Sequence, residues 1–245
     1  MRRALEVLAL VAVLVAVWQA LHIVGGDVAL SSPADTAVRA GEMLASAGFW
    51  PHVAETFTAL AYALAIAVLG GLAIGLLLGL HRLSGAVAEP ILVSLYSLPK
   101  ITLYPVILLI FGLGLSAKVA FGAIHGIVPV IIFTMGAVRA INPVYFRVSR
   151  VMRMTTADRI RSIVLPAALP EIVSGLRVGF SLTLLGVMIG EMFASQQGLG
   201  FLIMNAIGLH DVPTMMAVTL LLAVVAVAIN AVLLMLDHRL HRRAA

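Results

Sequence analysis

The chain has 245 residues, of which 62% are hydrophobic and 11% are charged, and its formal net charge is +5. Soluble domains contain about 45 to 50% apolar and about 25% charged residues, so this chain has too few charges to cover a water-soluble core. The composition excludes an ordinary soluble domain and indicates an integral membrane protein.

Six apolar segments have the length, about 20 residues, that a helix needs to cross a bilayer. They run over residues 4–24, 53–80, 90–113, 117–140, 172–194 and 214–236. Strands of a membrane barrel would be shorter and would alternate in polarity. The sequence therefore predicts an all-α membrane protein with six transmembrane helices in a single domain over residues 1–245.

The first segment follows two arginines and could be a cleaved signal peptide. Its length and the lack of a small-x-small cleavage site before Trp18 favour a retained helix instead. The polar segment 25–52 comes next, and Ser32 with the residues after it is typical of a cap that opens a short helix reaching Ser46. We expect this short helix on the outer surface.

Small residues recur at every fourth position in the second span, at Gly71, Gly75 and Gly79. In lipid, this spacing lets helix backbones approach closely where no hydrophobic force drives helices together. The same spacing recurs in the pairs Gly122/Gly126, Gly175/Gly179 and Gly186/Gly190. Membrane proteins are glycine-rich in general, which is the alternative explanation for a single pair. The threefold run favours helix packing through Gly71, Gly75 and Gly79.

Pro99 and Pro105 interrupt the third span, because each lacks a backbone donor and clashes with the preceding turn. The freed carbonyls need partners in protein or in a wet cavity, which points to a translocation path. Lys100 lies about 16 Å beyond Glu89 at about 1.5 Å per residue, close to the bilayer midplane. Lys100 either lines the path, snorkels along the kink or forms a structural ion pair, for example with Glu191.

A lysine that faces the path favours an anionic or zwitterionic solute. The residues expected along the path are Pro99, Lys100, Tyr104, His125 and Glu191. For His125 the alternative is a satisfied packing residue, and for Glu191 it is pairing within the outer half of its span. His125 has no histidine or carboxylate at i+3 or i+4, and the chain has no cysteine, so we predict no metal site.

Basic residues are distributed unevenly between the two sides of the membrane. With a cytoplasmic amino terminus, twelve of the 16 Lys and Arg residues lie inside, and six of these lie in or beside residues 142–170. The outer loops hold only Arg39 and Lys118. This bias predicts that both termini are cytoplasmic, and it explains the net charge without nucleic acid.

The cytoplasmic loop 142–170 ends in Ile163-Val164-Leu165-Pro166, followed by Ala167-Ala168-Leu169-Pro170. This stretch resembles the EAA loop of permease subunits of ATP-binding-cassette (ABC) importers, whose pattern ends in I-x-L-P. Further segments resemble the subgroup that imports taurine, aliphatic sulfonates, nitrate and thiamine-precursor pyrimidines: residues 98–100, 111–114, 175–178, 190–193 and 198–203. The likeness covers most of the chain from Ser32 onward.

The resemblance implies a type I ABC importer (MetI-like) permease fold, with a cytoplasmic coupling helix between spans four and five. It implies a homodimer in the bacterial inner membrane, two ABC ATPase subunits and an external substrate-binding protein, with alternating access for the solute. ATP and Mg²⁺ would be held by the ATPase, because this chain has no G-x-x-x-x-G-K-[ST] loop. No cofactor is expected in this chain.

The front half of the EAA pattern is missing. Arg147 stands at the position of its glutamate and Arg153 at the position of its glycine, which in the family gives a tight turn between two short helices. Arginine is costlier than glycine wherever φ is positive. Either the turn is built differently here, or the ATPase presents an acidic groove that accepts Arg147, Arg150 and Arg153.

The resemblance places a set of loop residues against the ATPase. They are Arg147, Arg150, Met152, Arg153, Met154, Thr155, Asp158, Arg159 and Arg161. A basic, partly helical loop that runs into the fifth span can transmit a push from a partner, and charge reversal at Arg159 is expected to uncouple ATP hydrolysis from transport. The alternative is a solvated loop that only obeys the positive-inside rule.

Two other classes of function remain as alternatives. An ion-coupled secondary transporter could use Lys100 and Glu191 to relay ions, and it would take up solute without ATP. An intramembrane enzyme needs a nucleophile with a base, or two aspartates, at membrane depth. The spans contain no aspartate pair and no G-x-S-x-G sequence. The sequence therefore predicts a transporter subunit rather than an enzyme.

Overall fold

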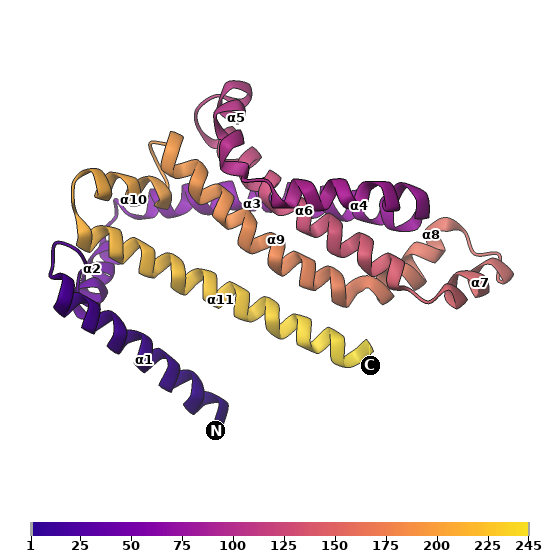
Figure 1. Ribbon diagram of the computed structural model, residues 1–245, viewed down its shortest axis with the longest axis horizontal. Coiled ribbons are helices and arrows are strands. Elements are labelled where there is room, and N and C mark those ends of the chain that lie inside the picture. Colours follow the sequence, from indigo (N-terminus) through magenta and orange to yellow (C-terminus); the bar gives the residue numbers. More distant parts are fainter. Residues whose placement is uncertain (1, 245) are drawn as a thin grey trace. The chain divides into compact units, whose positions relative to one another are not determined.

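The computed structural model describes the backbone of residues 2–244 and the side chains of residues 5–193 and 195–240, and this part of the chain contains helices and no strand (Figure 1). The helices are α1 (Arg2–Gly25), α2 (Pro33–Ala45), α3 (Trp50–Leu80), α4 (Arg82–Ser97), η1 (Lys100–Leu103), α5 (Tyr104–Phe111), α6 (Leu115–Ala140), α7 (Pro143–Val151), α8 (Thr156–Arg159), η2 (Ile160–Val164), α9 (Leu165–Ala194), α10 (Leu199–Gly208) and α11 (Val212–Ala244). Arg2, Arg3, Arg242 and Arg243, which count toward the predicted cytoplasmic charge, have side chains outside the described set.

Five helices are long and apolar enough to cross a membrane, and a sixth span results if α4 and the η1–α5 segment form one broken span. This number agrees with the six predicted spans. The two parts of the broken span meet at an angle of 87°. The bend follows from Pro99, because the residue before a proline is driven out of the helical region and Leu98 has a ψ of 137°.

Two helices begin earlier than the predicted spans. The third span was expected to begin at residue 90, but α4 begins at Arg82 and contains Pro90. The fifth span was expected to begin at residue 172, but α9 begins at Leu165 and follows η2 without a break. Hydropathy detects the apolar part of a helix. α4 extends beyond it into the mixed sequence of residues 82–89, and the start of α9 contains Pro166 and Pro170, which are usually read as helix breakers.

The chain divides into two compact units, each made of two stretches of sequence. The first comprises Met1–Thr56 and Glu191–Ala226, and the second comprises Phe57–Gly190 and Val227–Ala245. The second unit contains most of α3 and α9 and all of α4, α5, α6, α7 and α8. The prediction of one domain over residues 1–245 stays a prediction.

In the second unit, α6 packs against the glycine face of α3. A Cβ atom added at Gly71 would lie 2.6 Å from Val130, one at Gly75 would lie 2.6 Å from Thr134, and one at Gly79 would lie 2.7 Å from Val138. Because real Cβ atoms do not approach other atoms this closely, only glycine permits this separation of the two backbones.

A neighbouring side of α6 packs against α9, and the two helices run side by side in Figure 1. A Cβ atom at Gly175 would lie 2.5 Å from Phe133, and one at Gly179 would lie 2.7 Å from Val130. α6 is accordingly the best covered span, with 61% of its most apolar window buried. It forms the centre of the second unit.

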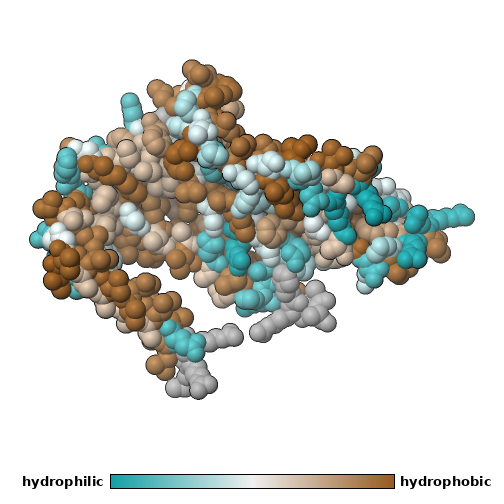
Figure 2. Space-filling model, viewed as in Figure 1, coloured by the Kyte–Doolittle hydropathy of each residue, from teal (hydrophilic) through white to brown (hydrophobic). Residues whose placement is uncertain are grey.

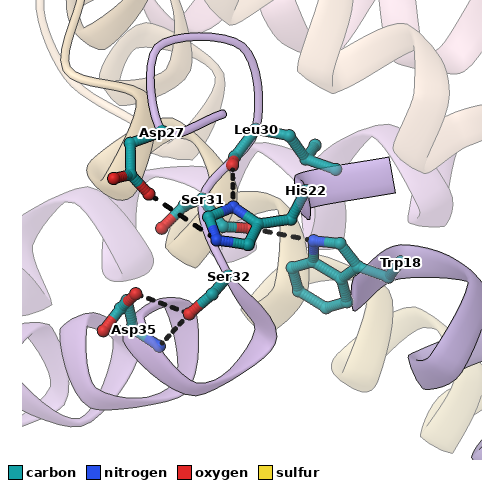
Figure 3. Close-up of polar contacts among 7 residues, drawn as sticks. All are labelled: Trp18, His22, Asp27, Leu30, Ser31, Ser32 and Asp35. Atoms are coloured by element: carbon teal, nitrogen blue, oxygen red, sulfur yellow. Dashed lines mark hydrogen bonds and ion pairs between the residues drawn. The ribbon is translucent and has the colours of Figure 1, made fainter. Parts of the chain in front are cut away.

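In the first unit, α1 is joined to α2 by a compact corner (Figure 3). Ser32 caps α2 by accepting a hydrogen bond from the N–H of Asp35 at 3.1 Å, which confirms the cap predicted there. Trp18 donates to the carbonyl of Ser31 at 3.0 Å, and Nδ1–H of His22 donates to the carbonyl of Leu30 at 2.7 Å. These bonds fix the end of α1 to the start of α2.

Candidate functional site

The predicted coupling loop consists of two short helices, α7 and α8, joined by a tight turn. Arg153 has a φ of +51° in this turn, which is the left-handed region. Its N–H donates to the carbonyl of Arg150 at 3.0 Å, and the N–H of Met154 donates to the carbonyl of Ser149 at 3.0 Å. This pair of bonds is a Schellman motif, which satisfies the last carbonyls of α7.

Arg153 therefore occupies a position whose backbone favours glycine. Glycine is the usual residue there because a Cβ atom in the left-handed region costs roughly 1–2 kcal/mol. The tight turn between two short helices is present although the motif glycine is an arginine.

α8 is capped and then continues into the fifth span. Thr155 Oγ1 accepts from the N–H of Asp158 at 3.2 Å and donates to Asp158 Oδ2 at 2.6 Å. α8 runs into η2, a π-helical segment that ends just before Pro166. A proline lacks an N–H and clashes with the carbonyl four residues earlier, so a widened turn before it is expected. α8, η2 and α9 therefore follow one another without a break.

Apolar and basic side chains share the exposed face of α7 and the turn, which we call the coupling surface. It comprises Arg147, Val148, Arg150, Val151, Met152 and Arg153. Val151 is 84% exposed and Met152 is 68% exposed, while the three arginines are also exposed. Figure 2 shows hydrophilic residues gathered over α7 and α8. Large apolar side chains exposed on a polar, basic segment are typical of a protein contact.

The other loop residues predicted to contact an ATPase differ in exposure. Thr155, Asp158 and Arg161 are exposed, and Met154 is half-buried. Arg159 is half-buried as well, and its Nε atom is buried without a hydrogen-bond partner among the described residues. A charge reversal at Arg159 would therefore also disturb buried packing, whereas one at the exposed Arg150 changes the surface alone.

A buried cluster connects α7 with the ends of α6 and α9. Its members are Ala137, Val138, Ile141, Val164, Ala168 and Ile172, and Phe146 of α7 packs against them. Burial of a valine or isoleucine side chain contributes roughly 1.5–3 kcal/mol, so Val138, Ile141, Val164 and Ile172 stabilise the base of the coupling surface.

Lys100 lies at the bend of the broken span. Its Nζ atom donates to the carbonyl of Tyr96 at 3.2 Å and lies 5.4 Å from the centroid of the Tyr96 ring, within the range of a cation–π contact. Lys100 is half-buried and Pro99 is exposed. Their place on a translocation path stays a prediction.

Tyr104 and His125 lie in the interior of the second unit. The hydroxyl of Tyr104 donates to the carbonyl of Gly190 at 2.7 Å. The ring of Phe121 lies edge-on to both, 4.8 Å from Tyr104 and 4.5 Å from His125, and Nδ1–H of His125 donates to the carbonyl of Phe121 at 2.9 Å. These contacts pack α5, α6 and α9 together, and a role for the two residues in the path stays a prediction.

Glu191 is fully buried in the first unit. Its carboxylate accepts from the hydroxyl of Thr56 at 2.8 Å and from the N–H of Gly200 at 2.9 Å. Thr56 Oγ1 in turn accepts from the N–H of Leu199 at 2.8 Å. Leu199 and Gly200 begin α10, whose first N–H groups have no partner within the helix and attract a negative charge. Glu191 thus fixes the start of α10.

The sequence did not reveal the partners of Glu191. Thr56 is 135 residues away, so no local spacing connects the two. His52 was also missed: its Nδ1 accepts from the N–H of Gly198 at 3.1 Å, and its ring stacks on Phe201. Gly198 has a φ of +121°, and a Cβ atom there would overlap the Glu191 carboxylate. The glycines of residues 198–203 were the one available signal.

Within the described residues, no group of three His, Cys, Asp or Glu side chains could hold a metal ion.

Residues 71–245 match the family of binding-protein-dependent transport system inner membrane components. The chain is 27% identical to a putative aliphatic sulfonates transport permease of Bacillus subtilis, over 95% of this chain and 85% of that protein. It is 30% identical to a riboflavin transport system permease of Chloroflexus aurantiacus, over 92% and 85%. Other relatives are named as permeases for taurine, formylaminopyrimidine and nitrate.

The fold is similar to a chain of the MetNI methionine ABC transporter in an inward-facing conformation, with a TM-score of 0.65 and 20% identity. The match covers 80% of this chain and 97% of that chain.

Proposed function

Because this chain belongs to the family of binding-protein-dependent transport system inner membrane components, we propose that its coupling surface docks an ATPase and that its spans pass a small anionic or zwitterionic solute into the cell. The chain is a transmembrane permease subunit of an ABC importer and is not an enzyme. A fold of this kind works with an ATPase and a substrate-binding protein. ATP and Mg²⁺ are then bound by the ATPase.

The coupling surface is the observation that carries this proposal. It combines exposed apolar side chains with three exposed arginines, on a helix pair that continues into α9. Interfaces typically combine an apolar centre with a rim that sets charge complementarity. We therefore expect a groove on the ATPase that is apolar in the middle and acidic where Arg147, Arg150 and Arg153 dock.

The nature of the solute is a second part of the proposal. Relatives are named for aliphatic sulfonates, taurine and nitrate, which are anions or zwitterions. Lys100, at the bend of the broken span, would offer such a solute a positive charge. Another relative is named for riboflavin transport, so the proposal rests on the lysine together with the first three names.

We also propose the assembly and its orientation. Two copies of this chain would form the path, both termini would face the cytoplasm, and the protein would lie in a bacterial inner membrane. The positive-inside bias of the arginines supports this orientation. An ion-coupled secondary transporter, the competing function, would need neither an ATPase nor a coupling surface.

The experiment compares Arg150→Glu with Arg239→Glu. Both residues are exposed arginines on the side proposed to be cytoplasmic, and Arg239 lies on α11, outside the coupling surface. The chain is purified in mild detergent together with the proteins that bind it, and uptake of taurine or a sulfonate is measured in proteoliposomes.

We expect Arg150→Glu to lower both ATPase recovery and ATP-driven uptake by about tenfold or more, since a misplaced charge at an interface costs several kcal/mol. Arg239→Glu should retain both. Uptake by the chain alone, driven by an ion gradient, would overturn the proposal in favour of a secondary transporter.

A further inference from the structure

A cavity of about 650 Å³ lies where α3 ends, α4 begins and α6 passes into α7, all within the second unit. Its apolar walls include Leu80, Val138, Ile141 and Phe146, and two arginines, Arg82 and Arg139, complete its lining.

Arg139 is held in a fixed position at this cavity. Its Nη1 donates to Glu89 Oε2 at 2.7 Å, its Nη2 donates to the carbonyl of Arg82 at 3.4 Å, and its side chain is only 25% exposed. A Cβ atom at Gly85 would overlap the guanidinium, so the glycine makes room for it against α4. A half-buried arginine that is held in one orientation and has donors to spare is typical of anion recognition.

Arg82 adds a second positive charge to the same lining. Within the described part of the chain, its guanidinium has no hydrogen bond and no ion pair, and the side chain is exposed. Glu89 balances one of the two arginines, so the cavity keeps a net positive charge. An anionic group could engage Arg82 and the remaining donors of Arg139.

We propose that this cavity binds the phosphate headgroup of an anionic phospholipid. The cavity lies at the ends of α3 and α6, two of the spans, which is the level at which headgroups lie. Basic pockets between transmembrane helices suit such headgroups. Apolar side chains continue outward along α4, where Leu83 is 79% exposed, and they offer a surface for the acyl chains. The apolar side chains would add no binding energy for a free phosphate ion, which has no acyl chains.

The site has a consequence for the coupling surface. Pro143 and Phe146, which line the cavity, belong to α7. A bound headgroup would therefore support the base of the segment that carries the coupling surface. This consequence rests on the proposed function, whereas lipid binding itself does not.

The test measures lipid retained by the purified full chain. The protein is incubated in detergent with equal amounts of phosphatidylglycerol and phosphatidylcholine, and the bound lipids are counted by native mass spectrometry. We expect phosphatidylglycerol to be enriched at least about fivefold, with the enrichment lost in Arg82→Ala and kept in Arg239→Ala. Equal retention of the two lipids, or equal loss in both variants, would overturn the proposal.

A second arm adds millimolar inorganic phosphate to the same incubation. We expect the bound phosphatidylglycerol to persist, because the acyl chains contribute to its binding. If phosphate alone displaces it completely, the site recognises a soluble anion and the lipid proposal is overturned. A chain that retains the lipid but takes up solute alone, driven by an ion gradient, would refute the proposed function and leave this inference in place.

Discussion

Arg153 combines a positive charge with a backbone conformation that favours glycine. The Schellman bonds of its neighbours require φ near +51°, so the residue is strained whatever its side chain contacts. Selection for the fold alone would favour glycine at this position. The strain is therefore consistent with a side chain that is kept for a contact outside this chain.

Replacing Arg153 with glycine should stabilise the protein. Relief of the left-handed strain, roughly 1–2 kcal/mol, exceeds the extra flexibility of glycine in the unfolded chain, so the net gain is about 0.5–1 kcal/mol. Arg150→Gly, within α7, should instead destabilise by about 1 kcal/mol. Thermal unfolding in detergent measures both. If both variants are destabilised equally, the strain at Arg153 is not real.

The carboxylate of Glu191 should be indispensable to the start of α10. In Glu191→Gln, one acceptor oxygen beside the Thr56 hydroxyl becomes an NH2 group, and the negative charge that faces the first N–H groups of α10 is lost. We expect a loss of about 1–3 kcal/mol in the free energy of unfolding. Faster hydrogen exchange at Leu199 and Gly200 than elsewhere in the variant would locate the damage. Unchanged exchange there would contradict the cap.

Asp211 gives a prediction about pH. The hydroxyl and N–H of Thr214, with Arg39 nearby, hold the pKa of Asp211 below its ordinary 3.8, against the opposing effect of burial. A pKa lowered in the folded state stabilises the protein above the unfolded pKa, and this stabilisation is lost as the pH falls through the folded value. Wild-type protein should therefore exceed Asp211→Asn in melting temperature near neutral pH. The gap should close below pH 3.8. A gap that does not change with pH would refute this assignment.

At the scale of elements, the contact of α3 with α6 depends on glycines that leave no room for a side chain. In Gly75→Ala, the new Cβ would lie 2.6 Å from Thr134 and 2.9 Å from the carbonyl of Ile131. We expect a loss of about 1–3 kcal/mol, because the helices must separate.

Gly136→Ala is the matched control for this prediction. Gly136 lies on α6, and an added Cβ meets no atom within 4 Å. Alanine should stabilise the helix there by up to about 1 kcal/mol. Unfolding in detergent by heat or by denaturant compares the two variants, and a stable Gly75→Ala protein would show that the close approach is not required.

Those features of the helices that depend on nearby residues could be predicted from the sequence. Apolar run length predicted the spans, and the prolines at 99 and 105 predicted the broken one. Hydropathy could not predict that α4 starts at Arg82 or that η2 joins α8 to α9, because polar residues at a helix end look the same as a loop. The position of the tight turn was predictable from the resemblance, but its left-handed arginine was not.

The buried polar contacts were the least predictable part of the site. Glu191 and Thr56 meet because two helices lie together, and Arg139 meets Glu89 over 50 residues of sequence. Such pairs depend on packing between segments that are far apart in the sequence. Rules based on residue spacing describe only neighbouring positions, so they cannot predict these pairs. Residues whose contacts are local, such as Thr155 with Asp158, follow from helix capping.

At the scale of the whole molecule, the spans differ in how much of their surface the chain itself covers. The most apolar windows of α6 and α3 are 61% and 22% buried, whereas those of α1 and α11 are 0% and 6% buried. The apolar surface of α1 and α11 must be covered by lipid or by another copy of the chain. A path for a solute between copies would use part of it, which is the reason to expect a dimer.

Mixing functional and defective subunits tests the dimer directly. Wild-type chain and Arg150→Glu are co-expressed in equal amounts with the ATPase, and ATP-driven uptake is measured per complex. If two copies assemble at random and each needs its own coupling surface, activity falls to about one quarter of the wild-type value, because only that share of dimers has two intact copies. Independent monomers would retain about one half. A value near one half would therefore exclude a dimer that needs both of its coupling surfaces, even if uptake still depends on ATP.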